Sequence, residues 1–226
     1  MQQQIETNNN EVKAKDNYVL KRRKEKKEMC DISEMTATVK GDFVYIMEGD
    51  EIYAYSIITF AWYGFPGAGY NDCALAIVHD LLTLIGGRSD QEMTNKLFSC
   101  TTERRNYASW TEEYAPMPTS RYGACALCTG AALIVAGGEG NADNTGKLAT
   151  IEVLNTATRQ WSTAVDLPQQ MFGGSLLQIG NDTLYMLGGY DKDQNPIQSV
   201  HMFTECPPPI IQFTFTGRTS CISFIP

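Results

Sequence analysis

Short apolar runs separated by polar turns follow one another along most of the chain. Three of these runs end in a pair of glycines, at residues 81–87, 132–138 and 183–189, and successive pairs are 51 residues apart both times. Runs of this length, rich in Leu, Ile and Val and bounded by turn residues, predict β-strands. A fixed interval of about 50 residues predicts an internal repeat.

Each repeat offers four strand candidates around its glycine pair. One apolar run precedes the glycine strand, as at 73–78, and another follows it. A fourth contains a tryptophan, and Trp110 and Trp161 are again 51 residues apart. A shortened copy lies at 41–66, and the last copy has Gln212 where a tryptophan is expected. We expect the glycines to be architectural, since glycine lets a strand end turn with positive φ.

This arrangement resembles the kelch repeat, in which four strands form one blade of a β-propeller. The resemblance rests on the Gly-Gly strand, the strand after it, the tryptophan, and the Met-Pro and Leu-Pro turns at 115–121 and 165–171. It covers about residues 35–203. It implies an all-β fold, a kelch-type β-propeller of about four four-stranded blades, at about 35–65, 73–115, 124–166 and 175–215.

The number of blades leaves two alternatives. Propellers have about four to eight blades, so four blades form either a compact closed array or an incomplete one, and the incomplete array is favoured. An incomplete array exposes blade faces and strand edges, which predicts self-association through open blade edges. Residues 31–226 are assigned to the propeller, and residues 1–30 to a polar, basic tail that is either disordered or a helical linker.

Charge divides the chain into a basic start and an acidic body. The 226 residues have a formal charge of −8, but residues 1–27 hold eight of the 18 Lys/Arg and four of the 26 Asp/Glu, so the remainder carries −12. An acidic body repels phosphates, so no nucleic-acid partner is expected. The basic run Lys21–Lys27 is typical of a nuclear-import or anionic-surface patch, although a solvated tail is the favoured interpretation.

The cysteines and the hydropathy pattern favour a reducing compartment. The seven cysteines are an odd number and are scattered, and the start of the chain has no apolar stretch typical of a signal peptide. No run approaches the ~18–20 apolar residues of a membrane span, so no membrane association is expected. The predicted localisation is cytoplasmic, with the nucleus as the alternative.

Few residues are candidates for catalysis or metal binding. The two histidines, His79 and His201, fall in different repeats. Cys125 and Cys128 are three apart on a predicted strand and therefore point to opposite faces. The stretch 191–195 imitates the start of a calcium loop but lacks the later glycine and glutamate. We expect no catalytic residue, no metal and no cofactor.

The loops of a propeller offer a broad surface to a partner. In the kelch proteins that this chain resembles, partners usually dock on the loops after the Gly-Gly strands and on the connections between blades. Exposed aromatic and arginine side chains contribute most to such binding. The residues predicted to bind a protein or peptide partner are Tyr70, Arg88, Arg121, Glu139, Phe172, Tyr190 and Asp191. The alternative for Tyr70, Arg121 and Phe172, which are 51 residues apart, is packing between blades.

The resemblance implies a non-enzymatic protein-interaction scaffold. One alternative is a propeller enzyme of the sugar-epimerase or oxidase type, but the oxidase needs two histidines that converge on the axis. Another is the substrate-receptor part of a ubiquitin ligase. That role normally comes from an upstream BTB domain, which residues 1–30 are too short to form, so it requires a longer product.

Overall fold

The computed structural model describes residues 35–102, 109–130, 132–140, 146–164, 166–180, 183–205 and 211–214. The predicted tail at 1–30, with its basic run, lies outside these residues. All regular elements within them are β-strands, and all strand pairs are antiparallel. The all-β prediction is confirmed.

Four of the five sheets follow one another along the chain, and we number these four as blades 1 to 4. Blade 1 contains β1 (Thr36–Lys40), β2 (Phe43–Glu48), β3 (Glu51–Ser56) and β4 (Trp62–Phe65). Blade 2 contains β5 (Ala74–Val78), β6 (Leu81–Ile85) and β7 (Leu97–Thr101), and a bridge from Ser99 to Thr111 marks its fourth strand. Blade 3 contains β9 (Cys125–Thr129), β10 (Ala132–Ala136), β13 (Ile151–Asn155) and β14 (Gln160–Thr163). Blade 4 contains β15 (Ser175–Ile179), β16 (Thr183–Leu187), β17 (Val200–Glu205) and β18 (Ile211–Thr214).

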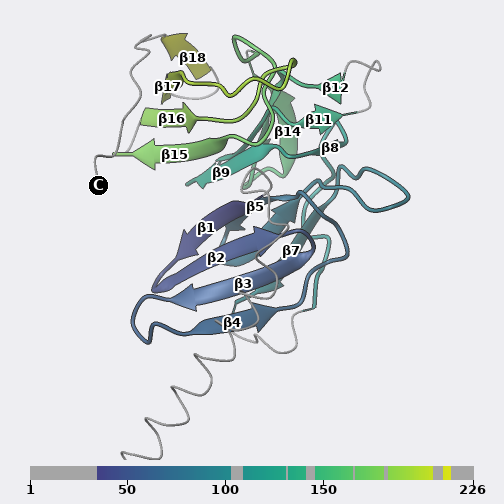
Figure 1. Ribbon diagram of the computed structural model, residues 1–226, viewed down its shortest axis with the longest axis vertical. Coiled ribbons are helices and arrows are strands. Elements are labelled where there is room, and N and C mark those ends of the chain that lie inside the picture. Colours follow the sequence, from purple (N-terminus) through teal and green to yellow (C-terminus); the bar gives the residue numbers. More distant parts are fainter. Residues whose placement is uncertain are drawn as a thin grey trace, which may run out of the picture.

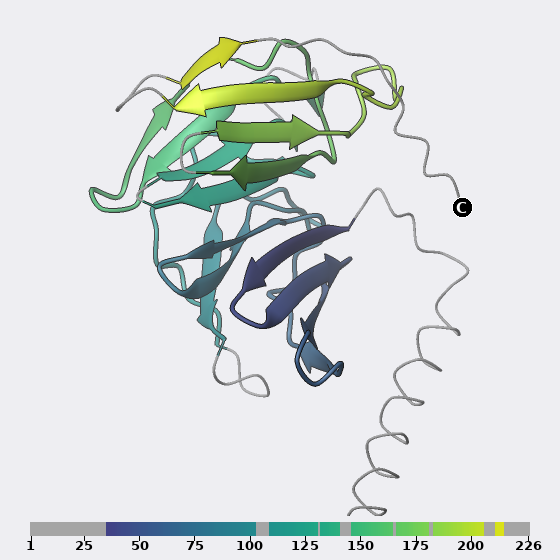
Figure 2. The ribbon, with the colours of Figure 1, turned by 90° about the vertical axis from the view of Figure 1, so that its left-hand side faces the viewer.

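The blades are arranged around their first strands (Figures 1 and 2). Strand β1 packs against β5, β5 against β9, and β9 against β15, so these four are the inner strands of the array. Among the described strands, β1 and β15 do not pack closely on each other. The four blades therefore form successive neighbours rather than a ring closed by a β15–β1 contact.

Each pair of neighbouring blades encloses its own apolar cluster. Tyr45 and Met47 of blade 1 meet Leu82 and Leu84 of blade 2. A second cluster fills the space between blades 2 and 3, and a third fills the space between blades 3 and 4. This pattern explains the continuous apolar runs in the sequence, because a middle blade buries both faces of its sheet.

The tryptophans connect neighbouring blades. The indole Nε1 of Trp110 donates a hydrogen bond to the Pro66 carbonyl at 2.9 Å, and that of Trp161 donates to the Ala115 carbonyl at 2.8 Å. In both cases the acceptor lies in the connection that leaves the preceding blade. The constant spacing of these residues therefore reflects a contact that recurs from blade to blade.

Candidate binding face

The predicted loops come together at one end of the blades, where the inner strands begin. In three successive places, the connection between two blades pairs with the loop after a Gly-Gly strand. The three backbone pairs are Asn71 with Arg88, Tyr122 with Glu139, and Phe172 with Tyr190. The middle pair belongs to a small sheet of β8 (Arg121–Tyr122), β11 (Glu139–Gly140) and β12 (Gly146–Lys147), on the right in Figure 1. We refer to this end of the array as the loop face.

A hollow opens on the loop face between the starts of the four inner strands. It is small and partly open to solvent. Its lining comes from all four blades and includes Met35, Thr36, Asp72, Gly123, Phe172 and Gly173. Because glycines line two of its sides, a ligand can approach the backbone closely there.

A row of two aromatic rings, with a cation at each end, borders this hollow. The Arg88 guanidinium lies over the Tyr122 ring, with its Cζ 4.4 Å from the ring centroid. The Tyr122 and Phe172 rings meet edge to face at 5.7 Å, and the Lys147 ammonium lies 5.9 Å from the centre of the Phe172 ring. Cation–π and edge-to-face contacts of this kind hold the side chains in defined positions.

Carboxylates contact two members of this row. Arg88 Nε donates to Asp72 Oδ2 at 2.6 Å, and the Asp72 side chain is only 5% exposed while that of Arg88 is 44% exposed. The pKa of Tyr122 is raised, first by burial and then by its hydrogen bond to Glu139. Tyr122 therefore stays a neutral hydrogen-bond donor, and Arg88 beside it is paired with Asp72.

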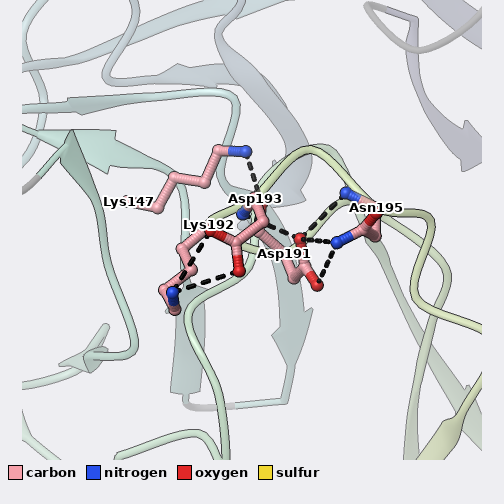
Figure 3. A network of polar contacts seen from close by, with 5 residues as sticks. All are labelled: Lys147, Asp191, Lys192, Asp193 and Asn195. Carbon is pink, nitrogen blue, oxygen red and sulfur yellow. Dashed lines mark hydrogen bonds and ion pairs between the residues drawn. The ribbon is translucent and has the colours of Figure 1, made fainter.

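The loop at 191–195 is organised by the side chain of Asp191 (Figure 3). Its Oδ1 accepts hydrogen bonds from the backbone N–H groups of Asp193 at 2.8 Å and Asn195 at 2.9 Å. Lys147 donates from its Nζ to the Asp191 carbonyl, which joins this loop to β12. The pKa of Asp191 is lowered, mainly by the Asn195 N–H, because these bonds favour the ionised form.

Loss of the Asp191 charge is expected to loosen this loop. A depressed folded pKa contributes stability above the unfolded value of about 3.9, and this contribution disappears as the pH falls through the folded pKa. Asp191→Asn is therefore expected to speed hydrogen exchange at the amides of Asp193 and Asn195 at neutral pH. Asp193→Asn is the matched control, since the exposed side chain of Asp193 contacts its neighbour Lys192 instead of the loop backbone in the described part of the chain. Equal exchange rates in the two variants contradict this account of the loop.

The seven residues predicted from the sequence all lie at the loop face, but their surroundings differ. Arg88, Glu139 and Tyr190 occupy the same place in three successive blades, opposite the inter-blade connection. Phe172 is half-buried beside the hollow. Tyr70 is half-buried, stacks on Phe98 at 5.2 Å and donates from its hydroxyl to Glu92.

Arg121 is fully buried and has internal partners. Its Nη1 donates to the Gly137 carbonyl at 2.9 Å, and its Nη2 lies 2.8 Å from Glu152 Oε1. Burial lowers the pKa of Arg121. This position supports the alternative that Arg121 packs between blades, and partner binding by the other six residues stays a prediction.

The expected equivalence of Tyr70, Arg121 and Phe172 is off by one residue in the last repeat. The N–H of Gly87 donates to the Arg121 carbonyl, and the corresponding N–H of Gly138 donates to the Met171 carbonyl. Met171 is thus the counterpart of Arg121, and Phe172 is the counterpart of Tyr122. Tyr122, Asp72 and Lys147 are the loop-face residues that the sequence analysis missed.

The structure also places the histidines and cysteines considered for catalysis. His79 lies in the turn between β5 and β6 and hydrogen-bonds the Tyr114 hydroxyl, whereas His201 lies on β17 and hydrogen-bonds Ser199. Cys125 packs toward blade 4 and Cys128 toward blade 2, and burial raises the pKa of Cys125 to about 12. Among the described residues, no group of His, Cys, Asp and Glu is placed to hold a metal ion. The described part of the chain also contains no helix that could span a membrane.

Comparison with known proteins identifies the repeat. No family model matches the chain. Kelch-like protein 40 from Xenopus tropicalis is 29% identical over 150 residues, which is 65% of this chain and 23% of that protein. The solved structure of YjhT, a kelch-repeat propeller protein, superposes with a TM-score of 0.64 at 16% identity, over 80% of this chain and 63% of that one. The chain is a distant kelch homologue. Its kelch-type propeller fold, expected from the sequence, is confirmed.

The other relative shares only a small part of its length with this kelch chain. The dynein alpha chain of the flagellar outer arm from Chlamydomonas reinhardtii is 25% identical over 162 residues, which is 66% of this chain and 4% of that protein. The chain therefore spans about a quarter or less of the curated relatives that it matches.

Proposed function

We propose that this kelch chain is a non-enzymatic binding module that holds a protein or peptide segment on its loop face. The observation that carries the proposal is the row of Arg88, Tyr122, Phe172 and Lys147 beside a hollow lined by all four blades. Aromatic and arginine side chains dominate binding energy at protein interfaces. A row that is already held by its own contacts loses little conformational entropy on binding.

The partner is expected to be a short segment with an apolar or aromatic anchor. An apolar side chain can pack against the Phe172 ring at the mouth of the hollow. Arg88, which is 44% exposed, can donate to a carbonyl or carboxylate. The acidic body works against nucleic acid as the partner. We place this activity in the cytoplasm, because the four cysteines within the described residues are free, which suits a reducing compartment.

Selection of peptides from a displayed random library on the immobilised chain tests the proposal. Peptides that bind the wild type are expected to lose at least about tenfold in affinity when Arg88 is replaced by alanine. Arg159→Ala is the matched control, since Arg159 also lies over a tyrosine, Tyr114 at 5.7 Å, but belongs to the β13–β14 turn at the opposite end. Thermal unfolding of both variants checks that the fold is kept. Equal affinity of the selected peptides for both variants contradicts binding at the loop face.

A further inference from the structure

One position of the inter-blade connections recurs three times, and only its first copy carries a side chain. Asp72, Gly123 and Gly173 each follow the residue that pairs with the loop after a Gly-Gly strand. All three line the hollow and have left-handed backbone conformations, with φ of 56°, 61° and 70°. Glycine adopts this conformation without strain, whereas aspartate only tolerates it, so the carboxylate at position 72 calls for a separate explanation.

The side chain of Asp72 is directed at Arg88. Its Oδ2 accepts the hydrogen bond from Arg88 Nε at 2.6 Å, and two backbone hydrogen bonds between Asn71 and Arg88, of 2.8 and 2.9 Å, hold the two segments in register. In the next two repeats the corresponding loop residues are Glu139 and Tyr190, and the corresponding connection residues are glycines. The aspartate therefore occurs in the repeat whose loop supplies a cation.

The ion pair changes what Arg88 can recognise. A further carboxylate brought to Arg88 by a partner would lie close to Asp72, whose side chain is only 5% exposed, so water and salt screen the repulsion weakly. A backbone carbonyl carries no net charge and accepts a hydrogen bond from a guanidinium without this repulsion. Of the two acceptors open to Arg88, the geometry therefore favours the carbonyl.

We propose that Asp72 determines the specificity of the loop face by neutralising Arg88, so that this face binds an uncharged or basic segment and discriminates against an acidic one. The inference rests on the binding function proposed above. Arg88 donates to a backbone carbonyl of the partner, while the apolar anchor packs against Phe172. The charge of −12 that the chain carries after residue 27 acts in the same direction, because it repels an acidic segment before contact.

Parallel selections from a displayed random peptide library on the immobilised wild type and on Asp72→Gly test the proposal. Glycine already adopts the required conformation at the two corresponding positions, and Arg88 is exposed enough to be hydrated, so the variant is expected to keep the fold. The wild type is expected to enrich uncharged or basic peptides, and Asp72→Gly to enrich peptides that contain Asp or Glu. The acidic peptides are expected to bind the wild type at least about tenfold more weakly than the variant.

Two further variants separate the charge of Asp72 from its structural role and from the charge of the whole chain. Asp72→Asn keeps an oxygen that can accept from Arg88 but removes the charge, so it is expected to bind the acidic peptides as Asp72→Gly does. A purely structural role would leave Asp72→Asn with the preference of the wild type. Asp80→Gly is the matched control, because Asp80 is also left-handed, with φ of 66°, but lies in the β5–β6 turn at the opposite end. It is expected to keep the wild-type preference.

The outcomes distinguish this inference from the proposed function. If the wild type selects acidic peptides that lose affinity in Arg88→Ala, or if Asp72→Gly keeps the wild-type preference, the role of Asp72 is overturned while binding at the loop face stands. If the wild-type peptides do not depend on Arg88, or if neither chain enriches a peptide, the loop face is overturned as the binding site and this inference with it. Thermal unfolding checks each variant, and Asp72→Asn decides the question if Asp72→Gly unfolds.

Discussion

Replacing Arg121 by methionine is expected to lower the free energy of unfolding by about 3–5 kcal/mol. The side chain of Arg121 is fully buried and that of Glu152 is 3% exposed, so the substitution leaves a buried carboxylate without its cation. Carbonyl groups of Gly137 and Thr150 also lose their donor. Urea unfolding followed by tryptophan fluorescence measures the change.

The double variant Arg121→Met/Glu152→Leu tests whether the ion pair itself stabilises the fold, or whether each charge is needed only because the other is buried. Removing both charges together is expected to restore stability to within about 1–2 kcal/mol of the wild type, since apolar replacements of buried pairs are often neutral. In blade 2, the corresponding positions carry the stacked rings of Tyr70 and Phe98 instead of an ion pair. A double variant as unstable as the sum of the single variants contradicts this interpretation.

Replacing Gly137 by alanine is expected to destabilise the chain by about 3 kcal/mol. Gly137 has φ of 65°, and a Cβ there would lie 2.5 Å from the Met171 carbonyl oxygen. That oxygen cannot move away freely, because it accepts the hydrogen bond from Gly138 that joins blade 3 to the connection with blade 4. The measurement is the same urea titration.

Gly130→Ala is the matched control for this substitution. Gly130 has φ of 53°, similar to that of Gly137, but a Cβ there would have no atom within 4 Å. Its replacement therefore carries only the cost of the left-handed conformation, about 1 kcal/mol. If the two alanine variants lose equal stability, the close approach of blades at Gly137 does not limit the fold.

Most of the architecture could be predicted because it repeats. The glycine pairs fixed the second strand of each complete blade, and the expected strands at 81–85, 132–136 and 183–187 match β6, β10 and β16. The tryptophan interval also reflects a real contact, since Trp110 and Trp161 bond equivalent carbonyls. In these elements the residues that the local sequence pattern marks are also the ones that pack between blades. The 51-residue periodicity was therefore sufficient to predict them.

The candidate site was harder to predict because two loops of blade 4 each differ in length by one residue, in opposite directions, and the two differences cancel. The turn between β15 and β16 is one residue longer than the turn between β9 and β10, and the connection before blade 4 is one residue shorter. The glycine interval hides both changes, so Phe172 was aligned with Arg121 instead of Tyr122. The burial of Arg121 depends on Glu152 in a strand distant in sequence, which no local pattern reveals.

Hydrogen exchange of the chain with and without a selected peptide tests the central claim most directly. We expect the peptide to protect amides where the inter-blade connections meet the loops after the glycine pairs, around Arg88, Tyr122, Glu139, Phe172 and Tyr190. Protection confined to the turns at the opposite end of the blades, such as 40–43 and 79–80, contradicts binding on the loop face.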